Sequence, residues 1–327
     1  MGVLQPGRAS AIEPTRSART ACAAMLGTIA SAAALAAGIL LGSAPALSAA
    51  PSSTMVSSSN VSSSRTRQAS YHATTSLAAR RSALRSIPID KLDATARAQV
   101  QSVLSNVGVF RRMPIRVVDC DPDLYLFLVR HPDVIVNIWE VLNISTLSLR
   151  QIAPNTYRIA EPNGTLADVR FLYRSHDTHI LYGEGSYDGP LFAQPVKGRC
   201  LMVLKTGYVR EPDGRYYITS RLDTFVSVDH EGAELLTKAI GPLMGKTADI
   251  NFVQTIAFLG SLSRTAEVNS AGVQRLAERL THVQPEARRR LAELATDVAR
   301  KYATASSRTT TVPTRVVSRT RVDAKGP

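Results

Sequence analysis

LADVRFLYRSHDTHILYGEGSYDGP, residues 166–190, carries the clearest structural signal in the chain. Apolar and polar side chains alternate along residues 166–174, which is typical of a strand with one buried face. His176-Asp177 then favours a turn, and a second run of strand-forming residues covers residues 178–187. Two strands joined by so short a turn must be antiparallel, because parallel neighbours need a crossover of roughly a dozen residues.

The same pattern continues on both sides of this hairpin. Turn-forming residues such as Pro154-Asn155 and Pro212-Asp213-Gly214 separate further runs of strand-forming residues. A short run rich in β-branched residues at 113–119 predicts one strand ahead of them. The six strands of the predicted meander are residues 147–153, 156–161, 166–174, 178–187, 197–209 and 215–228.

Apolar residues at helical spacing precede, interrupt and follow this predicted sheet. Asp121-Pro122 supplies an N-cap with proline at the first helical position, and Pro132 then separates two short helices. A longer helix is expected from Pro242 to about residue 268, because its apolar positions form a wide face. Other predicted helices cover residues 90–107, 271–283 and 285–302.

This order of elements resembles the helix-grip architecture of the START, Bet v 1 and polyketide-cyclase-like superfamily. The resemblance covers residues 113–268 and rests on topology and spacing, because the superfamily has no short diagnostic motif. It implies an α+β fold in which a curved, seven-stranded antiparallel sheet grips a long C-terminal helix, with extra C-terminal helices beyond it. A curved sheet closed by one helix leaves its centre unfilled unless the inward side chains are bulky. A pocket is therefore expected.

The alternation predicts which side chains face that pocket. Most of these positions would be ordinary core residues in a protein without a ligand. If the cavity exists, its wall is apolar and aromatic, which favours lipids, quinones, terpenoids or similar molecules. The residues predicted to bind the ligand are Trp139, Phe171, Tyr173, Leu181, Tyr187, Met202, Leu204, Phe252 and Ile256.

No motif for catalysis, for a metal or for a cofactor is found in the sequence. It lacks the nucleophile elbow, the P-loop, the dinucleotide fingerprint and the zinc helix motif, so none of these groups is predicted. The leading hypothesis is an exported, non-catalytic protein that binds a hydrophobic small molecule or lipid. One alternative is a structural or interaction protein with a solid core, whose helices at 271–302 contact a partner. The other is a cyclase or hydratase, which requires His179, Asp168 and Tyr173 to converge in one cavity.

Residues 1–49 have the features of an export signal. Arg8, Arg16 and Arg19 precede an uncharged apolar run at 21–41, and small residues follow it as a signal peptidase requires. The run is also long enough to cross a hydrocarbon core roughly 30 Å thick, so its retention as an anchor is the alternative. Either outcome places the protein in the periplasm, in the cell envelope or outside the cell.

The net charge of +13 is confined to the two ends of the chain. Residues 89–268 carry 19 basic and 20 acidic side chains, which argues against a nucleic-acid partner because such domains carry a basic surface. The basic ends suit an anionic membrane surface. Nothing indicates an oligomeric state. The predicted regions are a signal or anchor at 1–49, a Ser-rich disordered linker at 50–87, the helix-grip domain with its preceding helix at 88–268, a helical hairpin at 269–304 and a disordered basic tail at 305–327.

Cys120 and Cys200 are the cysteines that would remain after signal cleavage. An exported protein can form a disulfide from such a pair, although a neutral region of this size can bury a core without one. One bridge and two buried free thiols are both compatible with the sequence.

Overall fold

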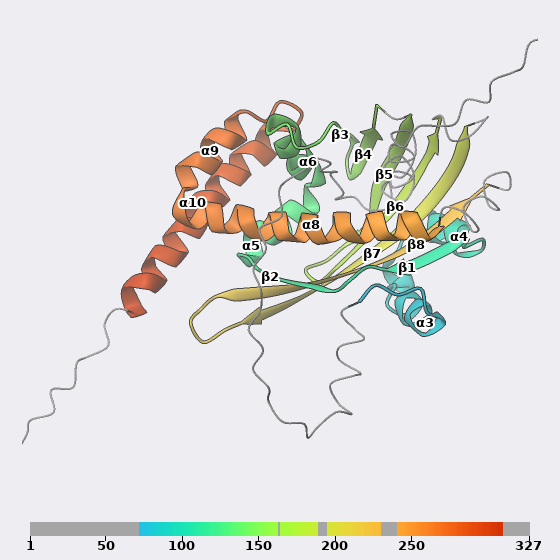
Figure 1. Cartoon of the computed structure of the whole chain (residues 1–327), viewed down its shortest axis with the longest axis horizontal. Helices are drawn as coiled ribbons and strands as arrows, with labels where there is room; N and C mark the ends of the chain where they lie inside the picture. The colour runs from blue at the N-terminus through green and yellow to red at the C-terminus, as the bar shows by residue number, and fades with distance from the viewer. Residues whose placement is uncertain (1–71, 163, 189–194, 230–240, 310–327) are drawn as a thin grey trace, which may run out of the picture.

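The computed structural model describes residues 72–162, 164–188, 195–229 and 241–309 (Figure 1). Its centre is an eight-stranded antiparallel sheet with the strand order β1-β8-β7-β6-β5-β4-β3, in which β2 also pairs with β8. The meander is confirmed, and its strands are β3 (Ser148–Ala153), β4 (Thr156–Ala160), β5 (Thr165–Arg174), β6 (Thr178–Tyr187), β7 (Val196–Arg210) and β8 (Tyr216–Val228).

The sheet has one strand more than the seven that were predicted. The expected strand at 113–119 contains β2 (Arg116–Asp119), and a further strand that was not predicted, β1 (Val109–Arg112), precedes it; both are antiparallel to β8. Pro114 lies between them, and proline cannot donate a ladder hydrogen bond. The predicted α+β fold, a curved antiparallel sheet with a long helix across it, is otherwise confirmed.

Helices lie on both faces of the sheet (Figure 1). The Asp121 carboxylate accepts hydrogen bonds from the backbone N–H groups of Asp123 and Leu124, so the predicted N-cap is confirmed. Pro132 begins the next helix, as expected from its fixed φ. The helices are α3 (Leu77–Arg85), the 3₁₀ turn η2 (Ile89–Lys91), α4 (Ala94–Leu104), α5 (Pro122–Arg130), α6 (Pro132–Val141), α8 (Gly241–Val268), α9 (Ser270–Glu278) and α10 (Pro285–Thr309).

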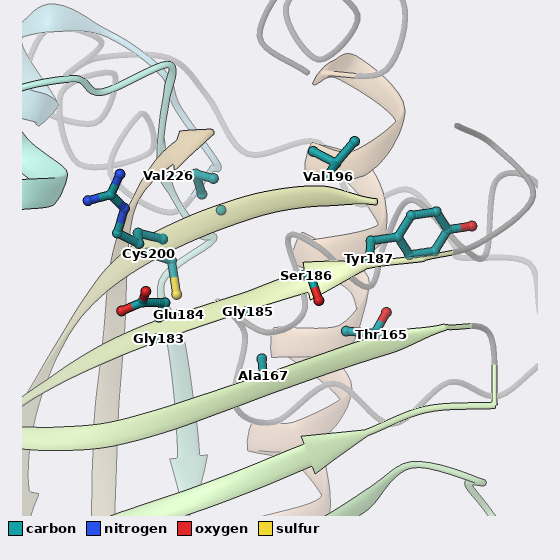
Figure 2. A pocket seen from close by; sticks show the side chains of 12 residues that line it. Thr165, Ala167, Gly183, Glu184, Gly185, Ser186, Tyr187, Val196, Cys200 and Val226 are labelled. Carbon is teal, nitrogen blue, oxygen red and sulfur yellow. The ribbon is translucent and has the colours of Figure 1, made fainter. Parts of the chain in front are cut away.

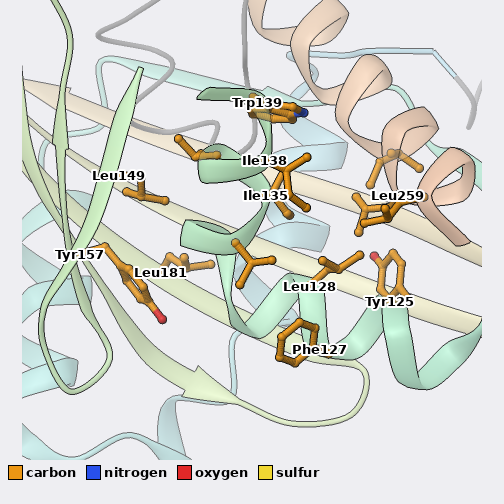
Figure 3. Close-up of a cluster of buried hydrophobic side chains, with 14 of the residues drawn as sticks. Tyr125, Phe127, Leu128, Ile135, Ile138, Trp139, Leu149, Tyr157, Leu181 and Leu259 are labelled. Carbon is orange, nitrogen blue, oxygen red and sulfur yellow. The ribbon is translucent and has the colours of Figure 1, made fainter. Parts of the chain in front are cut away.

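The main hydrophobic core lies between the concave face of the sheet and the helices α5, α6 and α8. Figure 3 shows Leu128, Ile135 and Ile138 of the short helices gathered between the sheet residues Leu149 and Leu181 and Leu259 of α8. Burial of this continuous apolar surface is the largest favourable contribution to folding, at about 25 cal/mol per Å².

A second core covers the opposite, convex face of the sheet. There Ala79 and Ala83 of α3, with Val100 and Val103 of α4, pack against sheet residues such as Phe225. The prediction that residues 50–87 form a disordered linker is therefore wrong for α3, whereas residues 50–71 lie outside the described part. A short, arginine-rich helix is marginal by itself, and packing on the sheet stabilises it.

Arg112 of β1 connects helix α3 to the sheet. Its guanidinium binds the fully buried carboxylate of Asp223, with Nε 2.6 Å from Oδ1, and donates to the Ala79 carbonyl oxygen at 3.3 Å. The backbone of Arg112 also exchanges two hydrogen bonds with Thr74. The start of the described chain is thus held against β1.

The C-terminal helices belong to the main core. Three of their apolar side chains are fully buried in the main core: Val273 of α9 and Leu291 and Val298 of α10. The interaction alternative placed a partner contact on the helices at 271–302, and these three apolar side chains are covered within the chain instead of forming an exposed stripe. Helix α10 extends to Thr309, past the predicted end at 304.

Cys120 and Cys200 are both buried free thiols, so the disulfide alternative is not realised. The predicted signal at 1–49 lies outside the described residues. Within those residues, no helix combines the length and the apolar composition needed to cross a bilayer.

Candidate ligand-binding site

A row of small residues crosses the middle of the sheet, where Ala167 of β5 pairs with Gly185 of β6 and Gly185 pairs with Gly198 of β7. A Cβ atom at Gly185 would lie 2.5 Å from the Leu166 carbonyl oxygen and would overlap Ala167. Only glycine therefore allows β5 and β6 to approach so closely. Glycine at such a position permits a sharp bend in a sheet.

A hollow lies over this row, on the concave face. Its wall is formed mainly by Thr165, Tyr187, Val196, Cys200 and Val226, which Figure 2 shows along neighbouring strands. The hollow has a volume of about 20 Å³, which is room for about one water molecule. In this state the hollow is a small, partly open recess.

The wall of the hollow is mainly apolar, although Glu184 and Arg199 also line it. Burial raises the pKa of the Cys200 thiol to about 12, so the side chain stays neutral and acts as a small apolar group. Thr165 is buried, and its Oγ1 has no hydrogen-bond partner among the described residues. A buried hydroxyl normally has a partner, so Thr165 offers one polar contact to a molecule in the hollow.

Beside the hollow, the concave face of the sheet is covered by large side chains. Phe171 pairs with Leu181, and Leu181 pairs with Met202. These three side chains join Trp139, Leu204, Phe252 and Ile256 in the main core. The structure thus brings seven of the predicted ligand residues together as packed core, and Tyr187 is the one that lines the hollow.

Tyr173 does not face the concave side as predicted. The register between β5 and β6 shifts between Phe171 and Tyr173, and this irregularity reverses the alternation. Tyr173 consequently packs against the second core on the convex face. Three consecutive apolar residues, Phe171-Leu172-Tyr173, were the signal that strict alternation fails there.

The residues required by the enzyme alternative do not converge. Asp168 pairs with Arg158 at 2.8 Å and is 43% exposed, while Tyr173 lies on the other core. His179 is fully buried on the concave side. The proposed set of His179, Asp168 and Tyr173 therefore lacks a common cavity, and no group of metal-ligating side chains occurs in the described ranges.

Sequence reasoning missed the small residues that shape the hollow. It weighed large inward side chains, whereas the recess depends on Ala167, Gly183, Gly185 and Gly198. The available signal was glycine inside a predicted strand, which often marks a bend or a close approach.

Comparisons with known proteins concern the fold. No protein-family model and no curated protein matches the chain. Among solved structures, a conserved protein from Geobacillus kaustophilus is 10% identical, with a TM-score of 0.30, over 44% of this chain and 93% of that one. Ara h 8.0201 is 11% identical, with a TM-score of 0.26, over 44% and 99%. The di-domain ARO/CYC protein BexL of the BE-7585A biosynthetic pathway is 14% identical, with a TM-score of 0.29, over 51% and 54%. At these values the likeness carries no information on activity or ligand.

Proposed function

We propose that this chain is a non-catalytic protein that binds a small, largely apolar molecule or lipid in the hollow over Ala167, Gly185 and Gly198. The observation that carries the proposal is the contrast between two parts of one face. Where Leu181 of β6 pairs with Met202 of β7, large side chains fill the space above the sheet. Where Gly185 pairs with Gly198, the side chains are absent and a recess remains. A concave apolar recess with few polar groups is the usual form of a small-molecule site.

The small volume of the hollow sets a condition on binding. A ligand larger than water has to displace lining side chains, so the protein must favour a widened state when the ligand is present. The apolar wall selects an apolar ligand, and Thr165 Oγ1 would meet one hydroxyl or carbonyl group on it. A charged ligand is disfavoured, because burial of an unpaired charge is costly.

The proposal includes export from the cytoplasm, on the basis of the charge and apolar pattern of residues 1–49. The basic ends would keep the protein near anionic membranes, where an apolar ligand is available. The mass of the mature chain, isolated from its own cell, tests whether the signal is removed.

Filling the hollow tests the binding site. Purified protein is incubated with a lipid extract, and native mass spectrometry measures the ligand that stays bound. Ala167→Leu should reduce bound ligand at least tenfold, because its side chain occupies the recess. Ala153→Leu is the matched control, since Ala153 is exposed at the end of β3, and it should bind like the unmodified chain.

Fluorescence of Trp139 verifies that each variant is folded, and Cys200→Leu provides a second way to fill the recess. The proposal fails if the unmodified chain retains no apolar molecule, or if both filled variants retain as much as the control.

A further inference from the structure

A groove runs between strand β2 at the edge of the sheet and helix α8. It has a volume of about 580 Å³ and is separate from the hollow. A Cβ atom at Gly260 would overlap Val118 Cγ2, so helix and strand are in direct contact at one point. The residues that line this β2–α8 groove are Arg116, Val117, Val118, Asp119, Val253, Ile256, Ala257, Gly260, Ser261 and Arg264.

Strand β2 has an unpaired edge in the described structure, because β8 is its one strand partner there. The Cys120 N–H donates to the Tyr216 carbonyl oxygen at 3.2 Å. Backbone direction alternates along a strand, so the N–H and C=O groups of Val117 and Asp119 point away from β8. The Val117 side chain is 49% exposed at this edge. An open edge of this kind can pair with another extended chain.

Of the three charged side chains that line the groove, two have ion-pair partners among the described residues and one does not. Asp119 pairs with Arg215 at 2.8 Å, and Arg264 pairs with Glu267 at 3.0 Å. Arg116 forms no ion pair with any described residue, and its buried Nε has no acceptor there. A carboxylate in the groove would supply the missing acceptor, and hydrogen bonds between charged groups are the stronger kind.

We propose that the β2–α8 groove binds an extended segment of a partner protein, which adds a strand to β2 and places a carboxylate against Arg116. A groove between an edge strand and a helix is suited to this mode, in which main-chain hydrogen bonds give affinity and side chains give specificity. The apolar wall of Val118, Val253 and Ile256 receives an apolar side chain of the same segment.

Charge disfavours the chain's own N-terminal region as the occupant. Residues 60–71 contain Arg65 and Arg67 and no acidic residue, so they would bring cations toward Arg116 and Arg264. The inference is independent of the hollow, because no residue lines both the hollow and the groove.

A phage-displayed library of random dodecapeptides, panned on the immobilised full chain, tests the proposal. Enriched peptides should contain Asp or Glu, and each is synthesised and measured by fluorescence anisotropy. Val117→Pro should weaken binding at least tenfold, because proline removes the N–H that faces the groove. Val117→Ala removes the exposed side chain but keeps the N–H, and it should change binding less than threefold.

Arg116→Gln should abolish the preference for acidic peptides, whereas Arg170→Gln, at an exposed arginine of β5, should preserve it. The proposal is overturned if no peptide is enriched, or if binding is insensitive to Val117→Pro. It is also overturned if a synthetic peptide of residues 60–71 displaces the probe at equal concentration. A dimer in sedimentation that Val117→Pro dissociates would assign the edge to a second copy instead.

Discussion

Two buried ionisable residues on the concave side, His179 and Asp133, have pKa values displaced in opposite directions. Burial is the main cause for His179, and repulsion by Arg130 and Arg174 adds to it, so its pKa falls to about 4. Burial likewise raises the pKa of Asp133 to about 6. In both cases the neutral form is favoured, because taking a charge out of water is costly.

The two shifts have opposite effects on stability. His179 has a folded pKa below its ordinary value of 6.5. Its contribution to the free energy of unfolding is therefore fully present above pH 6.5 and is lost as pH falls through about 4. Asp133 has a folded pKa above its ordinary value of 3.8. Its contribution to the free energy of unfolding is therefore present below pH 3.8 and is lost as pH rises through about 6. Between pH 4 and 6 the two contributions partly cancel.

Replacement of Asp133 should reveal this cancellation. We expect Asp133→Asn to raise the free energy of unfolding by about 2 kcal/mol more at pH 7 than at pH 4, because the amide has no charge to bury. His179→Phe should show the opposite pH trend. Urea unfolding followed by Trp139 fluorescence at both pH values measures each difference. An equal effect of Asp133→Asn at the two pH values would contradict this assignment.

At the scale of the secondary-structure element, strand β6 depends on one glycine for its close approach to β5. Gly185→Ala should destabilise the fold by about 1–3 kcal/mol, because the added methyl group meets the backbone of β5. Gly207→Ala in β7 is the matched control, since its nearest contact would be an ordinary 3.7 Å from Thr219. Thermal unfolding of both variants should show a loss at Gly185 alone, and equal losses would refute a specific role for the close approach.

The elements that sequence predicts well are those whose signals are local. Strand β6 was predicted with its observed ends, because turn residues flank a run of strand formers. The two short helices were marked by Asp121 and Pro132 in the same way. Local signals of this kind do not depend on which partner a segment packs against.

The failures concern features that distant contacts decide. Helix α3 has few large apolar residues, and its place is fixed by burial of Ala79 and Ala83 on a sheet surface built from later residues. The direction of Tyr173 follows from an irregularity in the pairing of two strands. The hollow depends on small residues, Ala167, Gly185 and Gly198, that line up across three strands, and this alignment requires the register. A single sequence does not give that register.

At the scale of the whole molecule, the C-terminal helices and the sheet share one core. Leu291 of α10 is fully buried in the same cluster as Trp139 of α6 and Met202 of β7. Lys301 of α10 also pairs with Asp121 and Asp123 at the start of α5, at 3.0 and 2.7 Å. These contacts connect the end of the described chain with an element near its beginning, so the hairpin should unfold together with the sheet.

Leu291→Ala tests whether the molecule unfolds as one unit. The change leaves a cavity, and we expect it to reduce the free energy of unfolding by about 2–5 kcal/mol. Trp139 is the one tryptophan of the chain, so its fluorescence reports on the main core, while circular dichroism reports on all helices. Both signals should shift to lower urea concentration by the same amount, and Leu166→Ala at an exposed position of β5 should shift neither. If Leu291→Ala moved the circular dichroism transition but left that of Trp139 unchanged, α9 and α10 would be an independent unit, because coincident transitions are the mark of a single cooperative core.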